Sequence, residues 1–209
     1  CGGIVIVQVK EIVKRGSIDP RLVAIPGVSV DYIVKGRPEY HLQCYDGTGY
    51  RPELVGAARV PLGTLPPMKL SLRKICGRRC AMQLRRGYHV NLGIGMPDSV
   101  ASVANEEGVT DEFLFSIETG LYGGVPVLGV SFGVSVNPES IMTITDSFDI
   151  YDGGSLDLAV LGMGEADEAG NVNVSKFGAK CTGPGGFIDI TQSTKRVCFM
   201  GTFAAGPME

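Results

Sequence analysis

The sequence lacks both an excess of charge of either sign and any long apolar run. It has 19 Lys and Arg against 22 Asp and Glu, so the net charge is −3, and both signs are mixed along the chain. This balance gives no electrostatic case for a nucleic-acid partner. No apolar stretch reaches the length of a membrane span, and no signal-peptide pattern precedes the first apolar segment. We therefore expect a soluble, cytoplasmic protein with no nucleic-acid or membrane partner.

The six cysteines lack the spacing of a disulfide framework. Because the chain has 209 residues and is 44% hydrophobic, it can build a core without cross-links, and the cysteines are expected to be reduced, buried thiols. His41, Cys44, Cys76 and Cys80 could together supply four zinc ligands. Cys76 and Cys80 are one helical turn apart, however, which is not the tight spacing of a zinc knuckle. We expect no metal.

A glycine-containing turn at residues 93–97 lacks the third glycine of the dinucleotide-binding fingerprint. Asp98 follows this turn and would repel a pyrophosphate, so a nicotinamide or flavin site is disfavoured. Asp98 is instead predicted to be the N-cap of a helix that Gly108 ends. The basic side chains of the preceding helix, Arg73 among them, are expected to form a solvated face.

The periodicity of apolar residues predicts the regular elements. Helices are predicted at residues 71–84 and 98–107, where apolar positions recur at helical spacing. Prolines and glycines interrupt every pattern in residues 35–68, which predicts a connector and a domain boundary near Pro67. The alternation of strands and helices predicts an α/β fold with an open, mostly parallel sheet and flanking helices. Strands are predicted at residues 4–13, 28–34, 88–92, 113–117, 156–161, 172–174 and 196–201, and surface turns at 148–154 and 167–171.

The buried strand predicted at residues 113–117 ends at a carboxylate, Glu118, and glycines follow at positions 120, 123 and 124. The carboxyl ends of the strands form the edge of an α/β sheet at which such folds bind ligands. Glycine lacks a Cβ atom, so backbone at these positions can approach a ligand closely. An ordinary solvated glutamate at a strand end is the alternative interpretation.

Three segments resemble motifs of the family I CoA-transferases, in the branch that contains propionate and acetate/3-ketoacid CoA-transferases. They are residues 91–97, 118–126 and 183–186. The resemblance implies that Glu118 is the covalent nucleophile, which would carry CoA as a glutamyl-CoA thioester while CoA moves between short-chain carboxylic acids. It also implies that CoA is a substrate and that no cofactor is needed. The glycines expected to contact CoA or an oxyanion are Gly93, Gly95, Gly123, Gly124, Gly185 and Gly186.

The resemblance further implies a division of the chain. Residues 1–34 would be the tail of an N-terminal half, residues 35–68 a connector, and residues 69–209 the half that carries the catalytic glutamate, incomplete at its C-terminus. The expected partners are acyl-CoA, small carboxylic acids, the missing N-terminal half and further copies of the chain in a homo-oligomer. A different class remains open: a truncated, catalytically incomplete module that acts as a binding or assembly domain.

Overall fold

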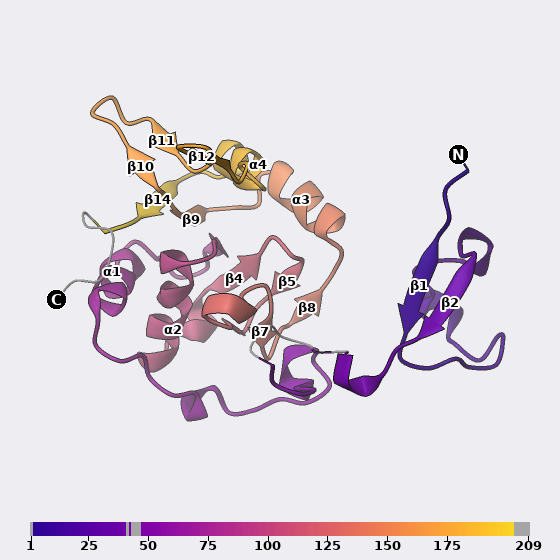
Figure 1. Ribbon diagram of the computed structural model, residues 1–209. Helices are drawn as coiled ribbons and strands as arrows, with labels where there is room; N and C mark the ends of the chain where they lie inside the picture. Colours follow the sequence, from indigo (N-terminus) through magenta and orange to yellow (C-terminus); the bar gives the residue numbers. More distant parts are fainter. Residues whose placement is uncertain (1, 41, 43–46, 203–209) are drawn as a thin grey trace. The chain divides into compact units, whose positions relative to one another are not determined.

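The computed structural model describes residues 2–40, 42 and 47–202 (Figure 1). The chain divides into two compact units, residues 1–50 and 51–209. In the first unit, β1 (Ile6–Val9) pairs in parallel with β2 (Tyr32–Lys35). Both strands are shorter than predicted, and part of the second prediction is replaced by a 3₁₀ turn at Gly27–Ser29. The other 3₁₀ turns of this unit are Pro20–Leu22 and Pro38–Tyr40.

The second unit is built on a six-stranded sheet in the order β14-β9-β3-β4-β5-β8. The pairings from β14 to β4 are parallel, and those of β5 with β4 and β8 are antiparallel. The predicted α/β class is confirmed, and the sheet is mixed. Its strands are β3 (His89–Leu92), β4 (Leu114–Ile117), β5 (Leu121–Tyr122), β8 (Ser140–Ile141), β9 (Leu158–Gly162) and β14 (Val197–Met200).

Helices cover both faces of this sheet (Figure 1). On one face, α1 (Leu72–Ala81) and α2 (Ser99–Glu106) pack on a core that includes Val90 and Phe115. On the other face, α3 (Ile144–Asp152) and α4 (Phe187–Ser193) pack on Ala159 and Leu161. Neighbouring residues of β9 point to opposite cores, so its sequence is a continuous apolar run, as expected for a strand buried on both faces.

Small antiparallel pairs and 3₁₀ turns complete the second unit. The predicted hairpin turn at residues 167–171 is confirmed, because the Asp167 carboxylate accepts the Asn171 N–H at 2.7 Å between β10 and β11. The pairs are β6 (Val125–Pro126) with β7 (Ser135–Val136), β10 (Glu165–Ala166) with β11 (Val172–Asn173), and β12 (Lys176–Phe177) with β13 (Lys180–Cys181). The 3₁₀ turns are Pro52–Leu54, Leu62–Thr64, Met96–Asp98, Thr110–Glu112 and Gly129–Ser131.

The division between the two units falls ahead of the expected boundary near Pro67. Residues 51–66 belong to the second unit. Leu54 is buried, the Asn137 N–H donates to the Glu53 carbonyl at 2.9 Å, and the Asn137 side chain makes two hydrogen bonds with the Val60 backbone. The segment is irregular because prolines interrupt it, yet these hydrogen bonds and the burial of Leu54 attach it to the rest of the second unit.

One local prediction is wrong, and one helix was not expected. Residues 148–154 were predicted to be a surface turn, but most of them form the end of α3. Thr143 caps this helix by accepting the Asp146 N–H. Phe148 and Tyr151 lie one turn apart and pack on the sheet, while Asp149 and Ile150 between them are exposed. Helix α4 was not predicted.

The cysteines are only partly as expected. Cys80 is buried and Cys76 and Cys198 are half-buried, but Cys181 is exposed, so the prediction of a buried thiol is wrong there. The remaining zinc candidates, His41 and Cys44, lie outside the described residues, as does Cys1. Within the described ranges, no group of three or more His, Cys, Asp or Glu side chains could hold a metal ion. No helix in the described part of the chain is long and apolar enough to cross a membrane.

Candidate active site

Glu118 follows directly after β4, at the carboxyl end of a buried strand, as predicted. The chain turns back at once, since Ile117 pairs with Leu121 in the antiparallel strand β5. Gly120 makes this turn possible. Its φ is 103°, and a Cβ atom there would lie 2.2 Å from the Met142 carbonyl oxygen. Glu118 is therefore held in a three-residue turn. The close packing of Gly120 against the Met142 backbone fixes the shape of this turn.

Glu118 lines a cavity of about 520 Å³ together with two of the three predicted motifs. Gly93 comes from the turn after β3, and Gly185 and Gly186 come from the loop before α4. Phe187, the first residue of α4, adds an apolar side chain to the wall. Segments that are far apart in the sequence thus meet at one cavity, which is the arrangement that the sequence predicted for Glu118 and the glycine loops.

Gly95, Gly123 and Gly124 do not line this cavity among the described residues. Cβ atoms at Gly123 and Gly124 would lie 2.6 Å from the Glu139 side chain and 2.1 Å from the Val136 carbonyl oxygen, so both glycines allow close packing within the protein. The Gly95 carbonyl accepts a hydrogen bond from a guanidinium on α1. A contact of these three glycines with CoA stays a prediction.

Burial raises the pKa of Glu118 above its ordinary value, and the glutamate's own backbone N–H and the Asn91 side chain oppose the shift. Within the described part of the chain, its Oε2 atom is buried and has no hydrogen-bond partner. A solvated surface glutamate would show neither feature. The carboxylate is poorly stabilised and keeps an oxygen free, which suits a group that must attack a carbonyl carbon.

A buried polar network lies behind Glu118. The His89 ring and the Tyr151 hydroxyl each lie 2.9 Å from the Ser116 hydroxyl, and the Asn91 amide donates to Tyr151 at 3.1 Å. Burial lowers the pKa of His89, which favours the neutral ring. Sequence reasoning missed His89, Ser116 and Tyr151 as parts of the site. The available signal was that positions 89, 91 and 116 are polar within otherwise apolar, buried strands.

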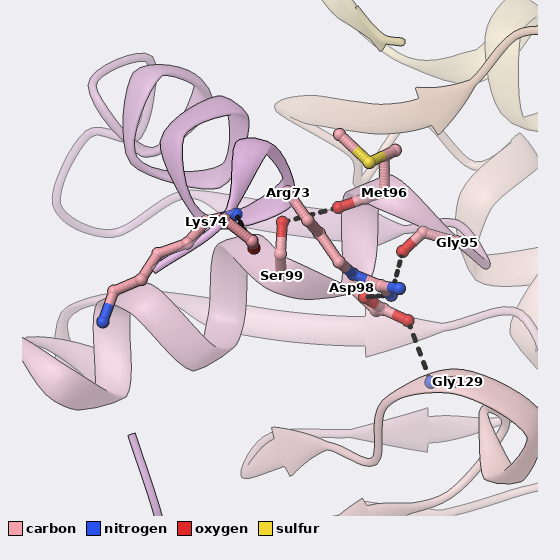
Figure 2. Close-up of polar contacts among 8 residues, drawn as sticks. Arg73, Lys74, Gly95, Met96, Asp98, Ser99 and Gly129 are labelled. Carbon is pink, nitrogen blue, oxygen red and sulfur yellow. Dashed lines mark hydrogen bonds and ion pairs between the residues drawn. The ribbon is translucent and has the colours of Figure 1, made fainter. Parts of the chain in front are cut away.

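Asp98 occupies the N-cap position of α2, as predicted, but its side chain has a different role. Its side chain makes no capping hydrogen bond and is completely buried, where it forms an ion pair with Arg73 of α1 (Figure 2). Arg73 also donates to the Gly95 carbonyl at 2.5 Å, and the Gly129 N–H donates to Asp98 at 3.3 Å. Burial raises the pKa of Asp98, and Arg73 opposes the shift. Arg73 is thus not part of a solvated face. It joins α1 to the turn that carries Gly93.

The fold and the site define an α/β protein with a desolvated glutamate and glycine loops at one cavity. No protein-family model matches the chain. The chain is 46% identical over 209 residues to caffeate CoA-transferase of Acetobacterium woodii and 39% identical over 208 residues to acetate CoA-transferase YdiF of Escherichia coli K12. It superimposes on crystal structures of YdiF as the apoenzyme, with a TM-score of 0.84 and 38% identity, and as a thioester complex with CoA, with a TM-score of 0.82 and 36% identity.

The chain is therefore homologous to part of these CoA-transferases, in agreement with the resemblance of its motifs. The matches cover 98–100% of this chain but only 38–40% of the lengths of these relatives. Part of the chain, 60% of it, also matches 62% of one subunit of a probable succinyl-CoA:3-ketoacid coenzyme A transferase of Bacillus subtilis, at 33% identity over 138 residues.

Proposed function

We propose that this chain is the glutamate-bearing part of an acyl-CoA:carboxylate CoA-transferase that moves CoA between short-chain carboxylic acids. The observation that carries the proposal is the placement of Glu118: it follows β4 and faces the cavity shared by the loops at Gly93 and Gly185. Acyl-CoA and small carboxylic acids are the substrates, and no metal or prosthetic group takes part.

Glu118 acts as a covalent nucleophile in this mechanism. Its carboxylate attacks the carbonyl carbon of acyl-CoA and expels the CoA thiolate, which leaves an acyl-glutamyl anhydride. The thiolate then attacks the glutamyl carbonyl, releases the first acid and leaves a glutamyl-CoA thioester. An acceptor carboxylate reverses both steps, so the energy of the thioester bond is kept throughout. Covalent catalysis divides one difficult exchange into easier ones.

Each step passes through an oxyanion that needs nearby N–H donors. The Gly93 N–H is already used, because it donates to the Val160 carbonyl at 2.9 Å. For the N–H groups of Gly185 and Gly186, no acceptor is found within the described ranges. We therefore propose these two as the oxyanion donors. Phe187 on the same wall helps to exclude water, which would hydrolyse both intermediates.

The test uses the full-length protein that contains these residues. Incubated with acyl-CoA and no acceptor acid, it should accumulate CoA covalently linked to Glu118, detected by mass spectrometry of proteolytic peptides. Glu118→Gln should abolish both the adduct and turnover, whereas Glu168→Gln, at an exposed glutamate, should leave both unchanged. Glu118→Asp should slow transfer on the order of 10²-fold, because it withdraws the carboxylate by about one methylene. Transfer by Glu118→Gln at the parent rate would contradict the assignment.

The remaining structure of the enzyme is also part of the proposal. Because the chain spans about 40% of the curated relatives' length, we propose that an N-terminal half completes the cavity and that residues 1–34 are its tail. We further propose a cytoplasmic homo-oligomer, which light scattering of the full-length protein would test. If that protein forms no CoA adduct with any acyl-CoA, the chain is better described as an incomplete binding or assembly module.

A further inference from the structure

Two thiols far apart in the sequence lie in contact on the face of the sheet covered by α1 and α2. Cys80 is in α1 and Cys198 is in the edge strand β14, and their Sγ atoms are 3.1 Å apart. A disulfide bond is about 2.05 Å long, so closing the gap requires a movement of about 1 Å. The two cysteines are separated by 118 positions. A bond between them would therefore join the first helix of the second unit to its last described strand.

This thiol pair opens onto a cavity of its own. The cavity has a volume of about 390 Å³, and its wall includes Cys76, Cys80, Cys198 and Arg79. It shares none of its lining residues with the cavity of Glu118. A small oxidant can therefore reach the sulfur atoms without entering the cavity that Glu118 lines.

The two thiols are not equivalent. The hydrogen bond from Cys80 lowers the pKa of Cys198 to about 7, although burial opposes the shift, and the charge of Arg196 adds to the lowering. The same contact raises the pKa of Cys80, and its burial adds to the rise. Cys198 is the less buried of the two thiols, so it is the one that carries the negative charge as a thiolate. Thiolates are the nucleophilic form of cysteine, so Cys198 is the thiol that reacts first.

We propose that Cys80 and Cys198 form a reversible disulfide when the protein meets a peroxide. The Cys198 thiolate attacks one oxygen of hydrogen peroxide, the O–O bond breaks, and hydroxide leaves, which gives a sulfenic acid. The Cys80 sulfur then attacks the sulfenic sulfur, the S–O bond breaks, and water leaves with the Cys80 proton. Two thiols and one peroxide give one disulfide and two waters. Intracellular disulfides of this kind are transient and respond to the redox state.

The test is a peptide map of the 209-residue chain after treatment with hydrogen peroxide and alkylation of the remaining thiols. Trypsin places each of the six cysteines in a separate peptide, and Cys80 and Cys198 fall in residues 80–85 and 197–209. We expect these two peptides to be linked, with a loss of about 2 Da for the two hydrogens. Dithiothreitol should release both peptides with unmodified cysteines.

Matched variants sharpen the result. Cys181→Ser, at an exposed cysteine outside the pair, should leave the cross-link unchanged. Cys198→Ser should slow the peroxide-dependent loss of the Cys80 thiol by about tenfold or more, because the reactive thiolate is removed. The absence of the linked peptide in the parent chain, or a link from residues 80–85 to any peptide other than 197–209, would overturn the proposal. The peptide map of the parent chain tests the proposal even if the variants do not fold.

Discussion

Replacing Arg73 by methionine should destabilise the second unit far more than the same change at Arg78, although both residues are on α1. Arg73 pairs with Asp98, whose side chain is 0% exposed, whereas the Arg78–Glu107 pair is 56% and 49% exposed. Removing one partner of a buried pair leaves an unpaired charge and costs about 3–5 kcal/mol. Arg73 is itself 34% exposed, so we expect a loss of about 3 kcal/mol, near the lower end of that range. An exposed pair contributes about 0–1 kcal/mol.

The pH dependence of the loss separates this explanation from a general packing defect. Without Arg73, only backbone hydrogen bonds such as that from Gly129 oppose the burial of Asp98, so its folded-state pKa rises further. A carboxyl group with a raised pKa lowers stability above that pKa, and the loss disappears as the group is protonated. The difference between Arg73→Met and the parent chain should therefore narrow as the pH is lowered from neutral towards the ordinary pKa of an aspartate.

Urea denaturation followed by far-UV circular dichroism would measure both effects, since the sequence contains no tryptophan for fluorescence. In thermal unfolding, a loss of about 3 kcal/mol corresponds to a midpoint about 6–12 °C lower for a unit of this size. Equal losses for Arg73→Met and Arg78→Met, or a difference that stays constant with pH, would refute the buried ion pair as the cause.

Three further expectations concern Glu118, the polar network behind it and the packing of a neighbouring glycine. Glu118→Gln should raise the melting temperature at neutral pH but not at about pH 4, because burial raises the pKa of the native glutamate and the charged form lowers stability. Tyr151→Phe should cost about 1–3 kcal/mol in thermal melts, since it leaves buried polar partners unsatisfied. Gly124→Ala should cost clearly more than Gly56→Ala in urea unfolding; both have φ near 70°, but only Gly124 has no room for a Cβ atom. Equal costs would show that the close contact relaxes freely.

The position of Glu118 could be predicted from the sequence, whereas the polar network behind it could not. An apolar run, a carboxylate and glycines are consecutive in the sequence, so the end of β4 was visible there. The network behind Glu118 depends on Tyr151, which lies on α3, and acidic residues within that helix made the segment resemble a surface turn. Packing of this segment against the sheet made it a helix, and the local composition gave no sign of that packing.

The glycines show a second limit of prediction from the sequence. Gly124 and Gly185 are both in motifs of the family, and both have positive φ values, 71° and 55°. Gly124 packs against the protein's own backbone, while Gly185 has open space where a side chain would be and lines the cavity. A sequence shows that a side chain is missing, but only the neighbouring atoms show whether the space is used by the protein or left for a ligand.

The turn at Glu118 also determines where the specificity of such an enzyme can be redesigned. Three residues join Ile117 to Leu121, and these two residues are paired across antiparallel strands. A single inserted residue would shift the register and turn every side chain of β5 to the opposite face of the sheet. The loop before α4 is not paired in this way, and an added Cβ at positions 183 and 185 would meet no atom within 4 Å. Both glycines have positive φ, however, so side chains are better varied at the residues next to them. Libraries that vary side-chain size therefore belong at Thr182 and Pro184, which line the cavity, with the glutamate turn and the proposed oxyanion donors left unchanged.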